Sequence, residues 1–201
     1  MKKYVILLIV LFFVQFGIGQ EVFNRESVVA FQEKMNTQFR NPETSPLKEE
    51  DLKTFEALDF YEISEKYFVK AKFIRTPDEK PFEMPTTTDR KPMYIKYGEI
   101  HFELDGKACR LDVFQNIELS KKPLYKNSLF LPFTDLTSGV ESYGGGRYLD
   151  LEIPEGDVMY IDFNKAYNPY CVYNYKYSCP IPPEQNDLPV EVKAGVKKFG
   201  E

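Results

Sequence analysis

The chain has 201 residues, 43% of them hydrophobic, which is enough for one domain with an apolar core of its own. It carries 26 Lys and Arg against 31 Asp and Glu, a formal net charge of −5. This balance excludes nucleic acid and anionic membrane surfaces as partners held by the overall charge of the protein, because their phosphates repel an acidic chain.

Residues 1–19 have the three-part pattern of a secretory signal peptide. Lys2 and Lys3 precede an apolar run that ends at Phe16, and small residues follow up to Gly19. The run is shorter than the roughly 20 residues that cross a bilayer. We therefore expect cleavage after Gly19, an exported protein in the periplasm or the medium, and no stable membrane insertion after cleavage. The remaining chain carries 24 Lys and Arg against 31 Asp and Glu, a net charge of about −7.

Residues 20–58 are predicted to form a helical segment. In NRESVVAFQEKMNTQF, four apolar residues recur at the three- and four-residue steps of one helix face: Val28, Phe31, Met35 and Phe39. A second, shorter helix is expected to begin at Ser45 as its N-cap, with Pro46 in the first helical position. We therefore expect one or two amphipathic helices ahead of the first strand.

Residues 59–201 are predicted to form a β-rich domain, because the apolar pattern changes to period two. YFVKAKFIR indicates one strand, and MYIKYGEIHFELDGKACRLDVFQ indicates two strands joined by a turn at Asp105 and Gly106. This turn sets Phe102 opposite Cys109, which makes Cys109 a core thiol. It also sets His101, the only histidine, opposite Arg110 on the polar face, where we expect an ordinary surface side chain.

A second hairpin is expected around the turn of residues 154–156, PEG. Its apolar face would hold Leu149 and Ile161, and its polar face would set Tyr148 opposite Asp162 with Asp150 diagonal to it. The predicted fold is therefore α+β, mainly an antiparallel β barrel or sandwich with the N-terminal helices covering it.

A run of glycines at residues 144–146 precedes Arg147. Glycines let backbone N–H groups approach an anion, and a guanidinium can bind a carboxylate or phosphate with two hydrogen bonds. However, a phosphate loop opens a helix, and here a strand follows. The alternative is a tight corner, with Arg147 paired to Asp135 or Asp162.

The carboxylates of Asp150 and Asp162 are the candidate catalytic pair. Two nearby acids in different environments can divide into a general acid and a base, as glycoside hydrolysis requires, or they can bind a hard cation. The alternative is a pair that is solvated or hydrogen-bonded to tyrosines.

Cys171 and Cys179 are separated by seven residues, unlike the short spacing of zinc-site cysteines. In an exported protein a disulfide is the favoured interpretation. A loop of this size would contribute on the order of 2.5 kcal/mol by the chain-entropy model. A reactive thiol and two unpaired packing cysteines are the alternatives.

Eight of the fourteen tyrosines lie in residues 141–183, in a chain without tryptophan. Their rings, beside asparagine side chains, could stack on a sugar or another neutral polar ligand. Equally, they could cover the open end of a β core.

Three stretches carry a family resemblance: LFLPFTDLTSGVESYGGGRYLDL, IDFNKAYNPYCVYNYKYSCPIPP and NDLPVEVKAGVK. They are similar to the bacterial domain-of-unknown-function family sixteen eighty-four, over most of the chain after the signal peptide. The resemblance implies signature positions within residues 135–180, but it brings no catalytic assignment.

These patterns together predict a cleft for a small polar ligand, either a saccharide or a carboxylated metabolite. Its expected ligand-binding residues are Asp135, Tyr143, Gly145, Gly146, Arg147, Tyr148, Asp162, Asn164, Tyr167 and Asn168. A hydrolase that uses the aspartate pair is one alternative, and a structural or protein-interacting envelope component is another. No motif for a cofactor or metal occurs, and the pattern does not decide the oligomeric state.

Overall fold

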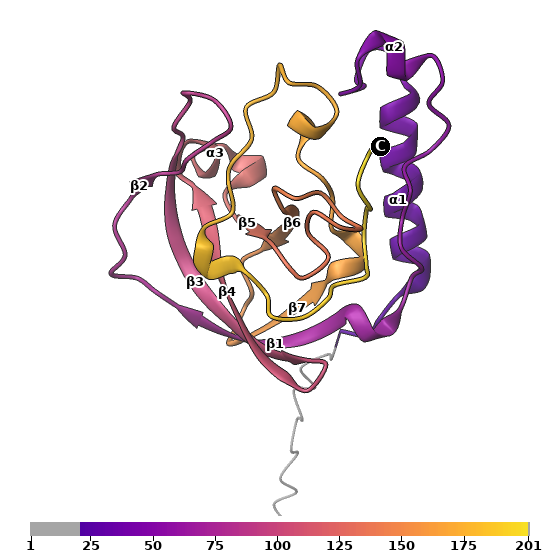
Figure 1. The fold of residues 1–201 in the computed structure, drawn as a ribbon. Coiled ribbons are helices and arrows are strands. Elements are labelled where there is room, and N and C mark those ends of the chain that lie inside the picture. The colour runs from indigo at the N-terminus through magenta and orange to yellow at the C-terminus, as the bar shows by residue number, and fades with distance from the viewer. Residues whose placement is uncertain (1–20, 201) are drawn as a thin grey trace, which may run out of the picture.

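The computed structural model describes residues 21–200, so the predicted signal peptide lies outside the described residues. The fold is α+β, as the sequence predicts: a curled, open antiparallel sheet accompanied by short helices (Figure 1). Seven strands form the sheet in the order β6-β5-β4-β3-β1-β7, and β2 pairs with β3 off this path. Within residues 21–200, no helix combines the length and apolar character needed to cross a membrane.

The strands have these bounds: β1 Phe68–Arg75, β2 Phe82–Glu83, β3 Met93–Leu104, β4 Lys107–Asn116, β5 Ser128–Phe133, β6 Arg147–Glu152 and β7 Val158–Asp162. The α-helices are α1 Arg25–Arg40, α2 Glu49–Leu52 and α3 Ile117–Ser120. Single 3-10 turns are η1 Glu65–Tyr67, η2 Pro123–Tyr125, η3 Phe163–Lys165, η4 Tyr170–Val172 and η5 Glu184–Asn186.

The hairpin of β3 and β4 has the predicted register. Phe102 pairs with Cys109, and His101 pairs with Arg110. Asp105 and Gly106 both have positive φ, 53° and 69°, as a two-residue hairpin turn requires. Cys109 is accordingly buried, and burial raises the pKa of its thiol.

The predicted hairpin of β6 and β7 is wrong. β6 pairs with β5, β7 pairs with β1, and the two strands form opposite ends of the sheet. The predicted alternation is nevertheless present, because Leu149 and Ile161 are both buried in the core. Side-chain period fixes which face of a strand is apolar, but it does not choose the neighbouring strand. Tyr148 therefore pairs with Pro132 of β5, and Asp162 pairs with Phe68 of β1.

The first predicted helix is confirmed by α1, whose N-cap Asn24 accepts a hydrogen bond from the Ser27 N–H at 2.9 Å. Val28 and Phe39 of the predicted apolar face are buried. The second helix, α2, begins three residues later than predicted, with Lys48 as its N-cap. Pro46 and Leu47 are buried, and Leu47 joins the cluster around Phe39, so tertiary packing holds this stretch in place of a first helical turn.

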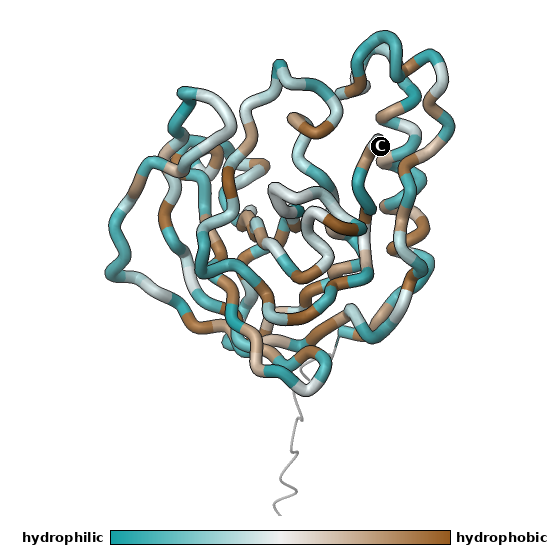
Figure 2. Tube along the Cα trace, in the orientation of Figure 1, coloured by the Kyte–Doolittle hydropathy of each residue, from teal (hydrophilic) through white to brown (hydrophobic). Residues whose placement is uncertain are grey.

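The main core lies on one face of the curled sheet and includes a segment near the C-terminus without regular structure. Val190, Val192 and Ala194 belong to this core and Val196 to the cluster around Phe39, and all four are at most 3% exposed. This segment runs beside α1, where Phe199 packs against Tyr173 and Tyr173 packs against Phe39 (Figure 1). Buried positions recur at every second residue along β1 and the second half of β3, as one buried face requires. Hydrophobic and hydrophilic residues are interspersed along the whole trace (Figure 2).

Candidate functional site

A groove of about 680 Å³ lies over the face of β5 and β6 that points away from the main core. Its walls come from α1, from α3 and η2, and from the loop of residues 169–180, which rises between α3 and α1 (Figure 1). Six tyrosines line it: Tyr94, Tyr125, Tyr148, Tyr167, Tyr170 and Tyr177. In size and largely aromatic lining it resembles the clefts that hold small ligands.

The period-two pattern of β5 and β6 explains why polar and aromatic side chains face the groove. Leu149 points into the core, so its neighbours Tyr148 and Asp150 point the other way. Asp150 pairs with Phe130 across the strands. The Tyr148 ring packs edge-on against Phe130 and Tyr167, and its hydroxyl donates to the Pro180 carbonyl. Two strands and one loop therefore fix the groove floor.

Asp150 is the acid of this groove. Its carboxylate accepts a hydrogen bond from the Tyr167 hydroxyl at 3.0 Å. Asp150 reaches solvent through the groove, yet the surrounding walls displace part of its hydration and raise its pKa, against the opposing effect of the Tyr167 hydrogen bond. Burial, followed by the charge of Asp150, raises the pKa of Tyr167 well above its ordinary value. Among residues 21–200, no cation lies within ion-pair distance of Asp150.

Arg147 and Asp135 do not reach the groove. They form an ion pair at 2.8 Å, and both side chains are 0% exposed. Arg147 also donates to the carbonyls of Val192 and Ala194. Asp135 accepts from the N–H groups of Thr137 and Val192, at 2.8 and 3.1 Å. The pair therefore ties the segment near residue 192 to β6 and offers no free guanidinium to an anion.

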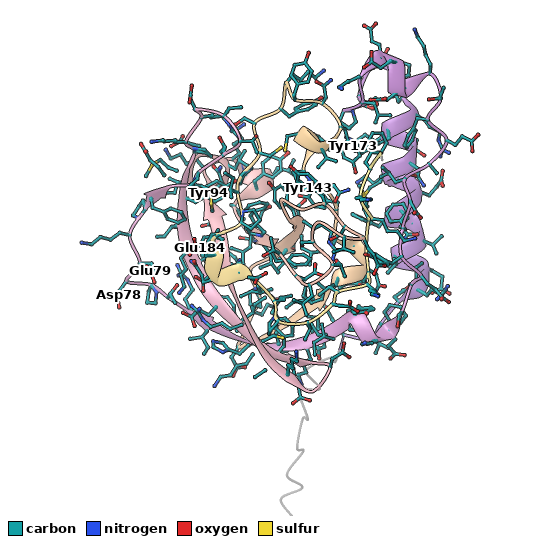
Figure 3. The ribbon with its side chains drawn as sticks, in the orientation of Figure 1. Asp78, Glu79, Tyr94, Tyr143, Tyr173 and Glu184 are labelled. Atoms are coloured by element: carbon teal, nitrogen blue, oxygen red, sulfur yellow. The ribbon has the colours of Figure 1, made fainter. Side chains whose placement is uncertain are left out.

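The glycine run forms a corner in front of β6. Gly146 has φ +88°, and a Cβ there would lie 2.5 Å from the Phe133 carbonyl oxygen, so glycine is required. Gly145 lies under the half-buried ring of Tyr143, where a Cβ would also be 2.5 Å from the ring. Tyr143 is labelled in Figure 3 near the centre of the molecule. This corner matches the structural alternative for the run, and neither glycine lines the groove.

Asp162, Asn164 and Asn168 hold neighbouring segments together. Asp162 accepts from the backbone and side-chain N–H groups of Asn164, at 3.1 and 2.8 Å. Asn164 exchanges hydrogen bonds with the backbone of Ser64, and Asn168 donates to the Lys197 carbonyl. Because β6 and β7 do not pair, the expected patch of Asp150 and Asp162 does not form: only Asp150 lines the groove.

The predicted disulfide is wrong, because Cys171 and Cys179 are free thiols. The segment between them is held without a bridge, by the Tyr173 and Asn174 N–H groups, which donate to the Tyr170 carbonyl, and by ring packing of Tyr170 on Tyr177. The Cys171 N–H donates to the Cys179 Sγ at 3.1 Å. A hydrogen bond from the Cys179 thiol lowers the pKa of Cys171 to about 7, while the same contact and burial raise that of Cys179.

His101 lies in a cluster of charges on the outer face of β3 and β4 that the sequence only partly indicated. Its Nε2 is 3.1 Å from Glu99. Arg110 forms two hydrogen bonds to Glu99, at 2.9 and 2.7 Å, and Lys96 lies 2.6 Å from the same carboxylate. The Arg110 hydrogen bonds, followed by that of Lys96, hold the pKa of Glu99 well below its ordinary value. The cluster is internally neutralised, and none of these side chains lines the groove.

Several groove residues were not predicted, namely Phe31, Met35 and Gln38 of α1, Tyr94 of β3 and Arg90. Phe31 and Met35 belong to the predicted apolar face of the helix, but they are only half-buried. The Gln38 side-chain N–H donates to the Tyr170 hydroxyl at 2.7 Å, which joins α1 to the loop. Tyr94 and Tyr173, labelled in Figure 3, lie on the sheet side and the α1 side of this region. The signal available in the sequence for this wall of the groove was the apolar face of the predicted helix, to which Phe31 and Met35 belong.

The comparisons with known proteins agree with the resemblance seen in the sequence. The family described as proteins of unknown function (DUF1684) matches residues 53–197. The chain belongs to this family. The solution NMR structure of an uncharacterized protein of Haloarcula marismortui is similar, with a TM-score of 0.67 and 32% identity over 86% of this chain and 92% of that one. The search of curated proteins finds no match. The DUF1684 match and this neighbour support the fold and give no activity.

Proposed function

We propose that this DUF1684 protein is a binding domain for a small, hydroxyl-rich polar ligand of the saccharide class, held in the groove over β5 and β6. The observation that carries the proposal is Asp150, whose carboxylate has the Tyr167 hydroxyl at 3.0 Å as its hydrogen-bond donor and lies among aromatic rings in that groove.

A carboxylate oxygen can accept more than one hydrogen bond, and a partly desolvated carboxylate without a cation gains most from new donors. Sugar hydroxyls supply pairs of such donors. The rings of Tyr170 and Tyr177 line the groove and offer aromatic surface for the C–H faces of a sugar ring, and the Tyr170 hydroxyl is held in place by the Gln38 side chain at 2.7 Å. A volume of about 680 Å³ is sufficient for one or a few sugar rings.

Two of the earlier alternatives lose their support. A carboxylated metabolite was expected to bind Arg147, but that guanidinium is fully buried against Asp135 and does not line the groove. A hydrolase that needs two adjacent acids was expected to use Asp162, which instead bonds to Asn164 away from the groove. The arrangement therefore favours binding over hydrolysis.

The test is a binding screen by NMR chemical-shift mapping and calorimetry, with mono- and oligosaccharides, and with nucleosides and organic acids as decoys. We expect a saccharide to perturb the groove tyrosines and Asp150, and to raise the melting temperature in proportion to its concentration. Asp150→Asn and Tyr167→Phe should each weaken this binding at least about tenfold, the cost of one charge-assisted hydrogen bond.

The matched control is Glu152→Gln. Glu152 is an exposed acid on the same face of β6, two residues further along the strand, and it does not line the groove. It should bind like the unaltered protein. Shifts that fall outside the groove, equal binding by Asp150→Asn, or no saccharide binding in the screen would each refute the proposal.

We also infer that the protein acts outside the cytoplasm. The support is the pattern of residues 1–19, two lysines before an apolar run and small residues. Fractionation of cells that express the full chain should find it in the periplasm or the medium, shortened by 19 residues. Replacing two leucines of the run by arginine should keep it in the cytoplasm at full length.

A further inference from the structure

Cys171 and Cys179 form a pair of thiols that the groove function does not use. Both lie in the loop of residues 169–180, and they meet through the Cys171 N–H, which donates to the Cys179 Sγ at 3.1 Å, and through a hydrogen bond between the thiols. Cys109, the third cysteine, is buried in β4 within the main core and has no such partner thiol.

Each cysteine of the pair is held in place by contacts that do not involve the other. Backbone N–H groups after Cys171 donate to the Pro169 and Tyr170 carbonyls and close the η4 turn. Cys179 is clamped by Thr87: its N–H donates to the Thr87 hydroxyl at 3.1 Å, and its carbonyl accepts from the Thr87 N–H at 2.9 Å. The two sulfurs are therefore positioned before any ligand arrives, which lowers the ordering cost of binding one.

The thiols lie at the edge of the groove, although Cys179 itself is only 5% exposed. Cys179 lines the groove, and Cys171 is half-buried. Arg90 also lines the groove at this point, where its guanidinium donates to the Ser178 carbonyl at 3.0 Å, next to Cys179. A positive charge is thus fixed beside the sulfurs, as a site that gains negative charge on binding requires.

The composition of the site selects the kind of ligand. Two sulfurs make a soft donor set, which favours soft cations over the hard, oxygen-preferring Mg²⁺ and Ca²⁺. Within residues 21–200, no group of three or more His, Cys, Asp or Glu side chains could share a metal ion. Structural zinc sites use four protein ligands and catalytic ones three, so this pair is too small for zinc. Of the soft cations, Cu(I) fits this pair, because it is monovalent and accepts two ligands.

We propose that Cys171 and Cys179 bind one Cu(I) ion between their sulfurs. The two S–H bonds break and release two protons, two Cu–S bonds form, and copper keeps its oxidation state. The resulting bis-thiolate unit has one negative charge, which the Arg90 guanidinium offsets. The site adds a metal to a chain whose sequence predicted none, and it does not depend on the ligand of the groove.

The test is a titration of the reduced protein with Cu(I) under oxygen-free conditions, in competition with a chromophoric Cu(I) chelator. We expect one Cu(I) per chain, and native mass spectrometry should show one copper gained with two hydrogens lost. Loss of outer-shell partners already weakens metal sites 10- to 100-fold, so Cys171→Ser and Cys179→Ser should each weaken binding at least about 100-fold. Zn(II) should bind far more weakly than Cu(I).

The matched control is Cys109→Ser, or Cys109→Ala if a buried hydroxyl unfolds the chain, and it should bind Cu(I) like the unaltered protein. Thermal unfolding of each variant checks that its fold is intact. The proposal is refuted if the chelator keeps all the Cu(I), if either Cys171→Ser or Cys179→Ser binds as tightly as the unaltered protein, or if Cys109→Ser alone loses the ion. Saccharide binding is measured separately, so either proposal can fail alone.

Discussion

Asp135 and Asp150 lie close together in the sequence, on either side of the glycine corner, but their surroundings in the structure differ completely. Asp135 is 4% exposed, and it accepts hydrogen bonds from Arg147, Thr137 and Val192. Asp150 is open to solvent in the groove and accepts one hydrogen bond, from Tyr167. A saturated, neutralised acid can only hold the fold together, whereas an acid that has spare acceptor capacity can receive a ligand. Residue type alone does not separate these two roles.

The largest effect is expected for Asp135→Asn. It leaves the Arg147 guanidinium in the core without its counter-charge, and breaking a buried pair in this way costs about 3–5 kcal/mol. Urea unfolding at pH 7 measures the loss. Asp157→Asn, at an exposed acid, is the control and should change little. A loss below about 1 kcal/mol for Asp135→Asn would remove the distinction between the two aspartates.

Gly146→Ala should come next. The residue precedes Arg147 at φ +88°, and an added Cβ would lie 2.5 Å from the Phe133 carbonyl oxygen, so we expect a loss of about 1–3 kcal/mol. Gly156→Ala is matched, because a Cβ there meets nothing within 4 Å and its φ is not positive. Equal melting temperatures for the two variants would contradict the structural role of the glycine corner.

Glu99→Gln tests a third, intermediate acid, which lies in the charge cluster of β3 and β4. Its pKa is lowered by Arg110 and Lys96, so it stabilises the folded state above the ordinary carboxyl pKa of about 4, and this stability is lost as the pH falls through the lowered value. We expect the variant to lose about 1–2 kcal/mol at pH 7 and less in acid. Glu103→Gln, exposed on the same strand, is the control. A pH-independent difference would refute the electrostatic cause.

The smallest effect on stability, and of opposite sign, is expected for Asp150→Asn. Desolvation raises the pKa of Asp150, so its contribution is fully present below the ordinary carboxyl pKa and is lost as the pH rises through the raised value. Without ligand, the asparagine variant should therefore be slightly more stable at pH 7, by less than about 1 kcal/mol given its exposure, and equal in acid. Glu152→Gln should show no such gain. A destabilised Asp150→Asn would mean that this acid, like Asp135, serves the fold.

The sequence predicted local structure well and distant neighbours poorly. The two-residue turn at Asp105 and Gly106 connects β3 directly to β4, so it determines their register over residues 98–113. The two strands that flank the turn after Glu152 do not pair with each other. In the curled sheet β6 pairs with β5, and β7 pairs with β1. Local spacing contains no information on this choice of partner.

The candidate site shows the same division. Tyr148, Tyr167 and Asp150 were named from the sequence and lie in the groove, while Arg147, Asp135 and Asp162 are used to hold the fold. An arginine and an aspartate twelve residues apart can pair with each other or with a ligand, and only their burial decides. Phe31 and Met35 line the groove only because α1 packs beside β5 and β6, which lie far from it in the sequence. The spacing of residues does not predict such packing.

The hydrogen bonds from Arg147 to the carbonyls at residues 192 and 194 have a consequence for how the chain is made. During synthesis the guanidinium of residue 147 is made before its acceptors, and the main core lacks the side chains of Val190, Val192 and Ala194 until that part of the chain has left the ribosome. The core around Arg147 can therefore close only after residues 192 and 194 have been made, so these late contacts complete the packing between β6 and the chain that follows it.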